Sequence, residues 1–374
     1  MLEAVRLDSN FAAAYLLLST LGVNTVSETD LYYDKAVSLK GSMNDVELCF
    51  FDIRSSYRDN DMDKRVQASE KLVNLLPNNA IAHERMSYTN YEMADIAGSR
   101  KSALNAIDND NYYSPAYGIL VNSYTFAEPK SFEKAEIYAK KVLDFNKDKS
   151  FYHVMLGDVY RAQNKLEKAA EKYDDAYDVG TNNWLSAAKA GHAYTMFDPE
   201  EARKRFDKAV SEARTNNQKI GPEYAKVYTY LHQNNFAMGL NQVKKIKNSL
   251  PIYGFSDQEV DSELSDLLWH EYFIYSHSGQ YNNARKSLAD KRKIDMKLAK
   301  LSKNDRSAFD TESTLLWMES HLEIMKGNYD KAKLKLNDLK KRFSDSSDPK
   351  RYDGYNNLMG MANLMSGNPQ KGIE

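Results

Sequence analysis

Residues 150 to 183 read SFYHVMLGDVYRAQNKLEKAAEKYDDAYDVGTNN, and this stretch decides the fold. The pattern recurs about ten times along the chain with a period of roughly 34 residues. Its recurring positions are a large residue, Leu, Gly and Tyr, followed by Ala, an aromatic residue and Ala: His153, Leu156, Gly157, Tyr160, Ala169, Tyr173 and Ala176. Self-similarity with this period is typical of a solenoid of stacked helix pairs.

A turn followed by a helix start recurs as well. It is present at 163–169, 279–284, 327–332 and 367–372. One repeat before residue 150, the first-helix positions hold Tyr117, Leu120 and Tyr124. Together these features resemble the tetratricopeptide repeat (TPR) family, whose repeat has a large residue, Leu, Gly and Tyr on one helix, then Ala, an aromatic residue, Ala and Pro. The resemblance covers nearly the whole chain and implies a right-handed α-solenoid, or superhelix.

The repeated residue types have a packing reason. Two antiparallel helices approach closely only where one of them presents little bulk, so Gly157 and Ala169 are expected at the contact, with Leu156 and Tyr173 filling the space around them. A single pair cannot bury both of its faces and must stack on its neighbours. We therefore expect an all-α fold of about nine to ten TPR-like helix pairs.

The pattern divides the chain into successive helix pairs. They are expected at 10–40, 43–76, 80–110, 114–147, 150–180, 183–215, 220–250, 256–302 and 306–343, with a last pair opening near Pro349. Asp198-Pro199 and Gly221-Pro222 each indicate an N-cap followed by Pro at the first helical position. Ser256 with Glu259 fits a capping box.

The helices after residue 250 are longer than the repeat requires. We expect a TPR-like solenoid over 1–250 and its continuation, with longer and divergent helix pairs, over 251–374. The alternative is a boundary between two solenoid segments near 251–255. Both ends of the sequence cut through the repeat, which predicts a piece of a longer protein whose original N-terminus is missing.

Composition and charge exclude several classes of protein. The 51 Lys and Arg residues against 53 Asp and Glu residues give a net charge of -2, without the basic excess of a nucleic-acid binder. With 16 Gly and 8 Pro, the chain is poor in the turn residues that sandwiches and barrels need. No apolar run reaches the roughly 20 residues that span a bilayer. A soluble segment is expected, cytoplasmic or periplasmic.

Motifs for chemistry are missing from the sequence. His83-Glu84 and His270-Glu271 begin like a zinc-binding helix, but Ser87 and Ile274 stand where the second His would be. His153 occupies the large-residue position of the repeat and is better explained by packing. The single cysteine, Cys49, has apolar neighbours and is expected to be a buried, inert thiol. We predict no enzyme activity, no metal and no cofactor.

The candidate binding residues follow from the family resemblance. In that family the first helices line the concave side of the superhelix, and their side chains that do not hold the repeat together are available to a ligand. The corresponding residues are Tyr88, Tyr91, Asn122, Thr125, Asp158, Arg161, Lys189 and His192. Such a mixture suits an extended peptide, because amides can pair with its main chain while tyrosines cover its side chains.

The resemblance favours one function and leaves a second open. Runs such as 3–15, 33–37 and 72–79 look like bacterial repeat proteins. We expect a non-catalytic scaffold for protein–protein interaction that binds a peptide or protein segment in the concave groove. The alternative is the sensory or regulatory repeat region of a larger signalling or transcriptional regulator. Neither the partner nor the oligomeric state follows from the sequence.

Overall fold

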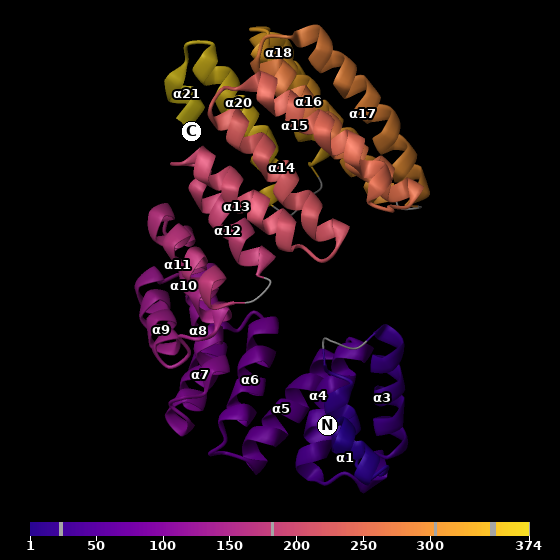
Figure 1. Cartoon of the computed structure of the whole chain (residues 1–374), viewed down its shortest axis with the longest axis vertical. Coiled ribbons are helices and arrows are strands. Elements are labelled where there is room, and N and C mark those ends of the chain that lie inside the picture. The colour runs from indigo at the N-terminus through magenta and orange to yellow at the C-terminus, as the bar shows by residue number, and fades with distance from the viewer. Residues whose placement is uncertain (22–24, 181–182, 303–304, 345–348, 374) are drawn as a thin grey trace. The chain divides into compact units, whose positions relative to one another are not determined.

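The computed structural model describes residues 1–21, 25–180, 183–302, 305–344 and 349–373 (Figure 1). Within these residues every regular element is a helix. The chain divides into two compact units, Met1–Val179 and Gly180–Glu374.

The first unit is a succession of antiparallel helix pairs that follows a short leading helix, α1 (Leu2–Leu7). The pairs are α2 (Ala12–Leu18) with α3 (Val26–Ser38), α4 (Asp45–Asp59) with α5 (Met62–Leu75), α6 (Ala80–Glu92) with α7 (Ile96–Asn109), α8 (Ser114–Phe126) with α9 (Phe132–Asp144), and α10 (Ser150–Ala162) with α11 (Leu166–Val179). From α4 onward, each second helix also packs against the first helix of the next pair, as in a solenoid.

The second unit continues the same organisation. Its pairs are α12 (Trp184–Tyr194) with α13 (Pro199–Glu212), α14 (Asn216–His232) with α15 (Phe236–Ser249), α16 (Asp257–His277) with α17 (Tyr281–Leu301), α18 (Asp305–Met325) with α19 (Tyr329–Arg342), and α20 (Asp353–Met365) with α21 (Pro369–Ile373). Short 3-10 helices at Lys40–Ser42, Leu250–Ile252 and Pro349–Tyr352 complete the described elements. The predicted all-α fold and its helix pairs are confirmed over the described residues.

In two of the pairs the contact between the helices depends on a glycine of the first helix. A Cβ atom on Gly157 of α10 would lie 2.6 Å from Cε1 of Tyr173 on α11, and one on Gly191 of α12 would lie 2.6 Å from Cε1 of Phe206 on α13. Both aromatic rings are completely buried. The second helix therefore lies as close as it does only because the first helix carries no side chain at that position.

A second repeated contact holds the start of three first helices, α6, α8 and α10. Nε2 of His83 lies 2.8 Å from the carbonyl oxygen of Pro77, and Nε2 of His153 lies 2.9 Å from that of Lys147. At the equivalent place on α8, the Tyr117 hydroxyl donates to the carbonyl oxygen of residue 111 at 2.9 Å. In all three repeats the large residue reaches the carbonyl six positions earlier and satisfies it. This contact confirms the packing role predicted for His153.

Two predicted helix starts are confirmed and one is wrong. Asp198 directly precedes Pro199, and its side chain accepts a hydrogen bond from the backbone N–H of Glu201. Ser256 forms the predicted capping box with Glu259. Pro222, however, lies inside α14, which begins at residue 216. A capping box between Thr215 and Gln218 starts this helix earlier, and the proline is accommodated within it.

The long helix α16 continues the core that precedes it. Leu250 and Leu267 belong to one buried cluster, and Tyr253 and Phe255 of the connecting segment pack against it. Residues 251–255 therefore lie on a continuous core, which favours lengthened helices within one solenoid. The division of the chain into 1–250 and 251–374 stays a prediction.

Candidate functional site

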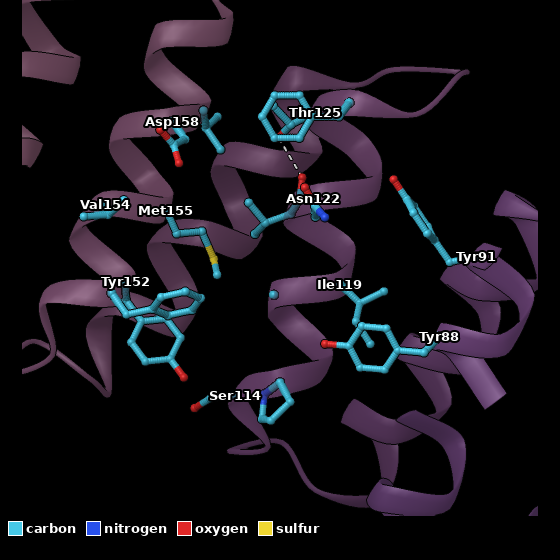
Figure 2. Close-up of a pocket in the computed structure, with 16 residues that line it drawn as sticks. Tyr88, Tyr91, Ser114, Ile119, Asn122, Thr125, Tyr152, Val154, Met155 and Asp158 are labelled. Atoms are coloured by element: carbon cyan, nitrogen blue, oxygen red, sulfur yellow. Dashed lines mark hydrogen bonds between the residues drawn. The ribbon is translucent and has the colours of Figure 1, made fainter. Parts of the chain in front are cut away.

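The first helices α6, α8 and α10 of the first unit form one surface with a cavity of about 520 Å³ (Figure 2). Helix α8 lies between the other two and contacts both. In the view of Figure 2, Tyr88 and Tyr91 of α6 lie on one side of the cavity, and Tyr152, Met155 and Asp158 of α10 lie on the other.

The lining follows the helical period. Helix α8 contributes residues spaced three or four apart, and α10 contributes the equivalent positions of the next repeat: Pro115, Ile119, Asn122 and Phe126 from α8, and Phe151, Met155 and Asp158 from α10. Residues with this spacing share one helix face. The opposite faces carry the residues that hold the pair together, so the repeat itself leaves this face to line the cavity.

Most of the lining is apolar. Phe151 is 65% exposed and Phe126 is 54% exposed, whereas Ile119 is buried at the floor. Met155 is half-buried. The site therefore combines an aliphatic floor with aromatic side chains that stand in solvent.

Two of the polar groups in the cavity differ in how they are held. Asn122 is exposed, and its amide makes no hydrogen bond among the described residues that surround it. Asp158 accepts a hydrogen bond from the buried Tyr173 hydroxyl at 2.7 Å, and an Arg161 nitrogen lies 3.7 Å from the same oxygen. The Tyr173 contact fixes the Asp158 carboxylate on a rigid part of the repeat. Asn122 can adapt to a ligand, whereas Asp158 is preorganised.

The tyrosine hydroxyls at the site are uncharged at neutral pH, and the charge of the cavity lining comes from Asp158. Burial, together with the nearby Glu84 carboxyl, raises the pKa of the Tyr88 phenol, so its hydroxyl stays protonated. Burial and the Asp158 carboxylate likewise raise the pKa of Tyr173, which keeps its donor proton. Among the described residues that line the cavity, Asp158 is the one charged side chain.

Similarity to proteins of known structure identifies the fold of the chain. No family model matches the chain, and no curated protein matches it in sequence. A tetratricopeptide repeat protein of known structure from Parabacteroides merdae superposes with a TM-score of 0.50 at 13% identity, over 76% of this chain and 98% of its own. The chain has the TPR fold.

Two other TPR-fold structures match shorter parts of the chain. MamA matches at 20% identity with a TM-score of 0.38, over 43% of this chain and 93% of its own. YrrB, described as a TPR protein with an unusual peptide-binding site, matches at 17% identity with a TM-score of 0.40, over 49% of this chain and 93% of its own.

Five of the residues expected on the inner helices of the TPR fold line the cavity together: Tyr88, Tyr91, Asn122, Thr125 and Asp158. The Thr125 hydroxyl donates to the Val121 carbonyl at 2.6 Å and is buried, so it contributes its methyl group rather than a polar contact.

The other three candidates lie elsewhere. Arg161 is on α10 but outside the cavity lining. Lys189 and His192 are on α12 of the second unit, where the exposed His192 ring packs against Phe206 with centroids 5.1 Å apart. They are not part of this cavity.

The sequence reasoning missed the apolar part of the site. Ile119 and Met155 lie one turn before Asn122 and Asp158, and Pro115 and Phe151 lie a further turn back. Position within the repeat was the signal that could have found these residues. An apolar residue two positions before the large residue of a repeat does not pack inside the helix pair. Phe151 occupies this position and is largely exposed to solvent.

No group of three or more His, Cys, Asp or Glu side chains in the described part of the chain is arranged to hold a metal ion. The described helices include none that is both long and apolar enough to cross a bilayer. His270 packs between Tyr224 and Tyr228, and its Nδ1 donates to the Asp266 carbonyl at 2.7 Å. Burial lowers the pKa of His270, consistent with a neutral packing residue.

Proposed function

We propose that the protein is a non-catalytic interaction scaffold that binds a peptide or protein segment on the surface of α6, α8 and α10. The observation that carries this proposal is the row of solvent-exposed apolar side chains, above all Phe126 and Phe151, around one cavity with an aliphatic floor. Burial of exposed apolar surface favours association, and a few large side chains commonly contribute most of the binding energy of an interface.

A segment of chain fits this surface better than a compact small molecule. The lining extends over three successive first helices, so contacts repeat along the surface rather than converge on one point. Asn122 offers a donor and an acceptor at the centre, and both can pair with the main chain of an extended segment. Tyr88 and Tyr91 supply large aromatic surfaces with a polar end, a combination typical of protein interfaces.

The polar groups do not form a catalytic arrangement. Asp158 is held by the Tyr173 hydroxyl, whose raised pKa disfavours its use as a base. The hydroxyl of Thr125 is directed to a backbone carbonyl of its own helix. Burial raises the pKa of the Tyr173 hydroxyl, so its proton stays on the phenol although it is hydrogen-bonded to Asp158, and the Thr125 hydroxyl donates to a carbonyl rather than to a base. We therefore infer binding rather than reaction at this site.

The test compares two double variants with matched chemistry. Phe126→Ala with Phe151→Ala removes exposed apolar surface from the first helices. Leu104→Ala with Ile137→Ala removes exposed apolar surface from the second helices α7 and α9, where these side chains are 37% and 55% exposed. Each protein is used as bait in native extract, and captured proteins are quantified by mass spectrometry.

We expect a partner that is captured by the wild type and by the α7/α9 variant but lost by the α8/α10 variant. Loss of one buried aromatic anchor costs about 2 kcal/mol, so the double change reduces affinity by several hundred-fold or more. Equal retention of the partner by both variants would contradict the proposed surface. A regulatory role within a larger protein would use the same surface, and the identity of the captured partner distinguishes it from a simple scaffold.

A further inference from the structure

We infer that the groove between α17 and α19 is a second binding surface of the protein, and that it takes an acidic protein segment with several Asp or Glu carboxylates in succession. The groove belongs to the second unit and is formed by other residues than the surface proposed on α6, α8 and α10. Binding at the groove therefore does not depend on the proposed function.

The walls of the groove are two second helices of successive pairs, which enclose a cavity of about 410 Å³. Helix α17 contributes Arg285, Ala289 and Arg292, and α19 contributes Lys331 and Lys335. Residues that are four or seven positions apart lie on the same face of a helix. Each wall therefore presents a row of positive charges to the groove.

Helix α18 lies at the floor and packs against both α17 and α19. The floor is apolar, because Leu315 and Leu322 of α18 and Leu288 of α17 are buried there. The same helix also contributes the carboxylates of Glu319 and Glu323. With four Lys or Arg side chains against these two carboxylates, the lining has a net positive charge.

The two carboxylates of the floor already have cationic partners. Nη1 of Arg292 lies 3.1 Å from Oε1 of Glu319, and Nζ of Lys335 donates to the other oxygen of this carboxylate. Nζ of Lys331 lies 3.4 Å from Oε1 of Glu323. These ion pairs hold three of the four cationic side chains at the groove, and they use only part of the donors that those side chains carry.

The fourth cation of the groove is not neutralised. Arg285 is exposed, and no residue in the described part of the chain forms a hydrogen bond or an ion pair with it. Its planar guanidinium can bind a carboxylate through two parallel hydrogen bonds. Lys331 is 61% exposed and has donors left besides the one directed to Glu323. A carboxylate of a partner can therefore bind here without displacing an existing ion pair.

The distribution of the cations suits a segment of chain rather than a single small anion. Arg285 and Arg292 are seven residues apart and therefore lie roughly 10 Å apart along α17, and Lys331 and Lys335 lie about 6 Å apart along α19. In an extended segment, side chains at i and i+2 point to the same side and are roughly 7 Å apart. Successive carboxylates can thus contact successive cations, whereas one small anion reaches only part of the row.

Charge complementarity also distinguishes this groove from the cavity on α6, α8 and α10. The described residues that line that cavity include no lysine or arginine. An acidic segment therefore meets complementary charge at the groove between α17 and α19 and not at that cavity. The TPR resemblance assigns ligand contacts to the first helices, so it does not predict a surface whose walls are second helices.

The experiment uses a fluorescent peptide, Ser-Glu-Glu-Leu-Glu-Glu-Ser, and its counterpart with Gln in place of every Glu. Binding to the full chain is measured by fluorescence anisotropy at low and high salt. The double variant Arg285→Gln with Lys331→Gln removes two cations of the groove. The control, Lys286→Gln with Lys333→Gln, removes two lysines of the same helices that do not line the groove, so both variants have the same net charge.

We expect the wild type to bind the Glu peptide about ten-fold tighter than the Gln peptide. The groove variant should bind the Glu peptide about five-fold more weakly than the wild type, and the control variant should bind it as the wild type does. High salt should remove most of the advantage of the Glu peptide, because ion pairs at exposed groups are screened. This salt dependence is measured on the wild type alone and does not require the variants to fold.

Four results would contradict the inference. Equal binding of the two peptides, or failure of both to bind, would exclude recognition of acidic residues. An equal loss from both double variants would mean that net charge and not the groove determines binding. Displacement of the peptide by inorganic phosphate, but not by chloride at the same ionic strength, would indicate a site for small anions. A wild-type dimer in sedimentation velocity that the groove variant dissociates would assign the groove to a second copy of the chain.

Discussion

Replacing Gly157 with alanine should destabilise the first unit by about 1.5–5 kcal/mol, although alanine favours helix more than glycine. The new Cβ would lie 2.6 Å from Cε1 and 2.8 Å from Cδ1 of Tyr173, distances that side chains do not tolerate. The Tyr173 ring is completely buried and has no free space into which it can rotate. Either the ring or the whole of α11 must shift.

The magnitude has three contributions. Overpacking a well-packed contact costs ~1–3 kcal/mol. Displacing the ring also breaks the hydrogen bond from its hydroxyl to the charged Asp158 carboxylate, worth ~1.5–3 kcal/mol. Replacing glycine with alanine within a helix stabilises the folded state by about 1 kcal/mol and offsets part of this loss. The sum is a net loss of about 1.5–5 kcal/mol.

Urea denaturation followed by far-UV circular dichroism measures the effect, and Gly118→Ala is the matched control. A Cβ on Gly118, also inside a first helix, would meet only the terminal methyl of Met155 at 3.4 Å, so this change should be neutral or stabilising. A double-mutant cycle with Tyr173→Leu should show strong coupling to Gly157→Ala, because the smaller residue makes room for the methyl group. Coincident unfolding curves for wild type and Gly157→Ala, or additive effects in the cycle, would refute the close contact.

Two further predictions concern the second unit. Gly191→Ala should destabilise by only about 0–2 kcal/mol, because Phe206 has no hydroxyl and so no hydrogen bond to lose; an effect as large as that of Gly157→Ala in the same urea assay would contradict this account. Burial and the neighbouring His277 lower the pKa of His321 from 6.5 to about 4. The unfolded chain therefore binds more protons between these values, and stability falls by ~2 kcal/mol from pH 7.5 to 5. His321→Asn, which keeps a donor for the Tyr272 hydroxyl, should lose this part of the pH dependence, and identical pH profiles of the two proteins would refute it.

The fold was predictable because its packing depends on residue types at fixed spacing. Gly157 and Tyr173 specify a contact that the sequence states directly, and the helix pairs were recovered to within a few residues. The helix start differs from the one predicted at Pro222 because the capping box of Thr215 and Gln218 starts the helix earlier. Local start signals compete, and the sequence does not show which one prevails.

The site was predictable only in part. Tyr88, Asn122 and Asp158 occupy equivalent positions of three repeats and were found from that equivalence. The apolar floor of Ile119 and Met155 was not found, because an apolar residue on a helix is ordinarily assigned to the core. Lys189 was grouped with them because the repeat pattern continues through α12, although that helix belongs to the second unit. Periodicity identifies a helix face but not where along the repeats a cavity opens.

The central claim, that a protein segment binds on α6, α8 and α10, is tested most directly by site-specific photo-crosslinking in native extract. A benzophenone amino acid replaces Asn122 at the centre of the cavity in one protein and the exposed Ile137 on α9 in another. We predict a discrete cross-linked partner from position 122, displaced by excess unlabelled protein, and none from position 137. Cross-linking of the same partner from position 137 with none from position 122 would contradict the claim.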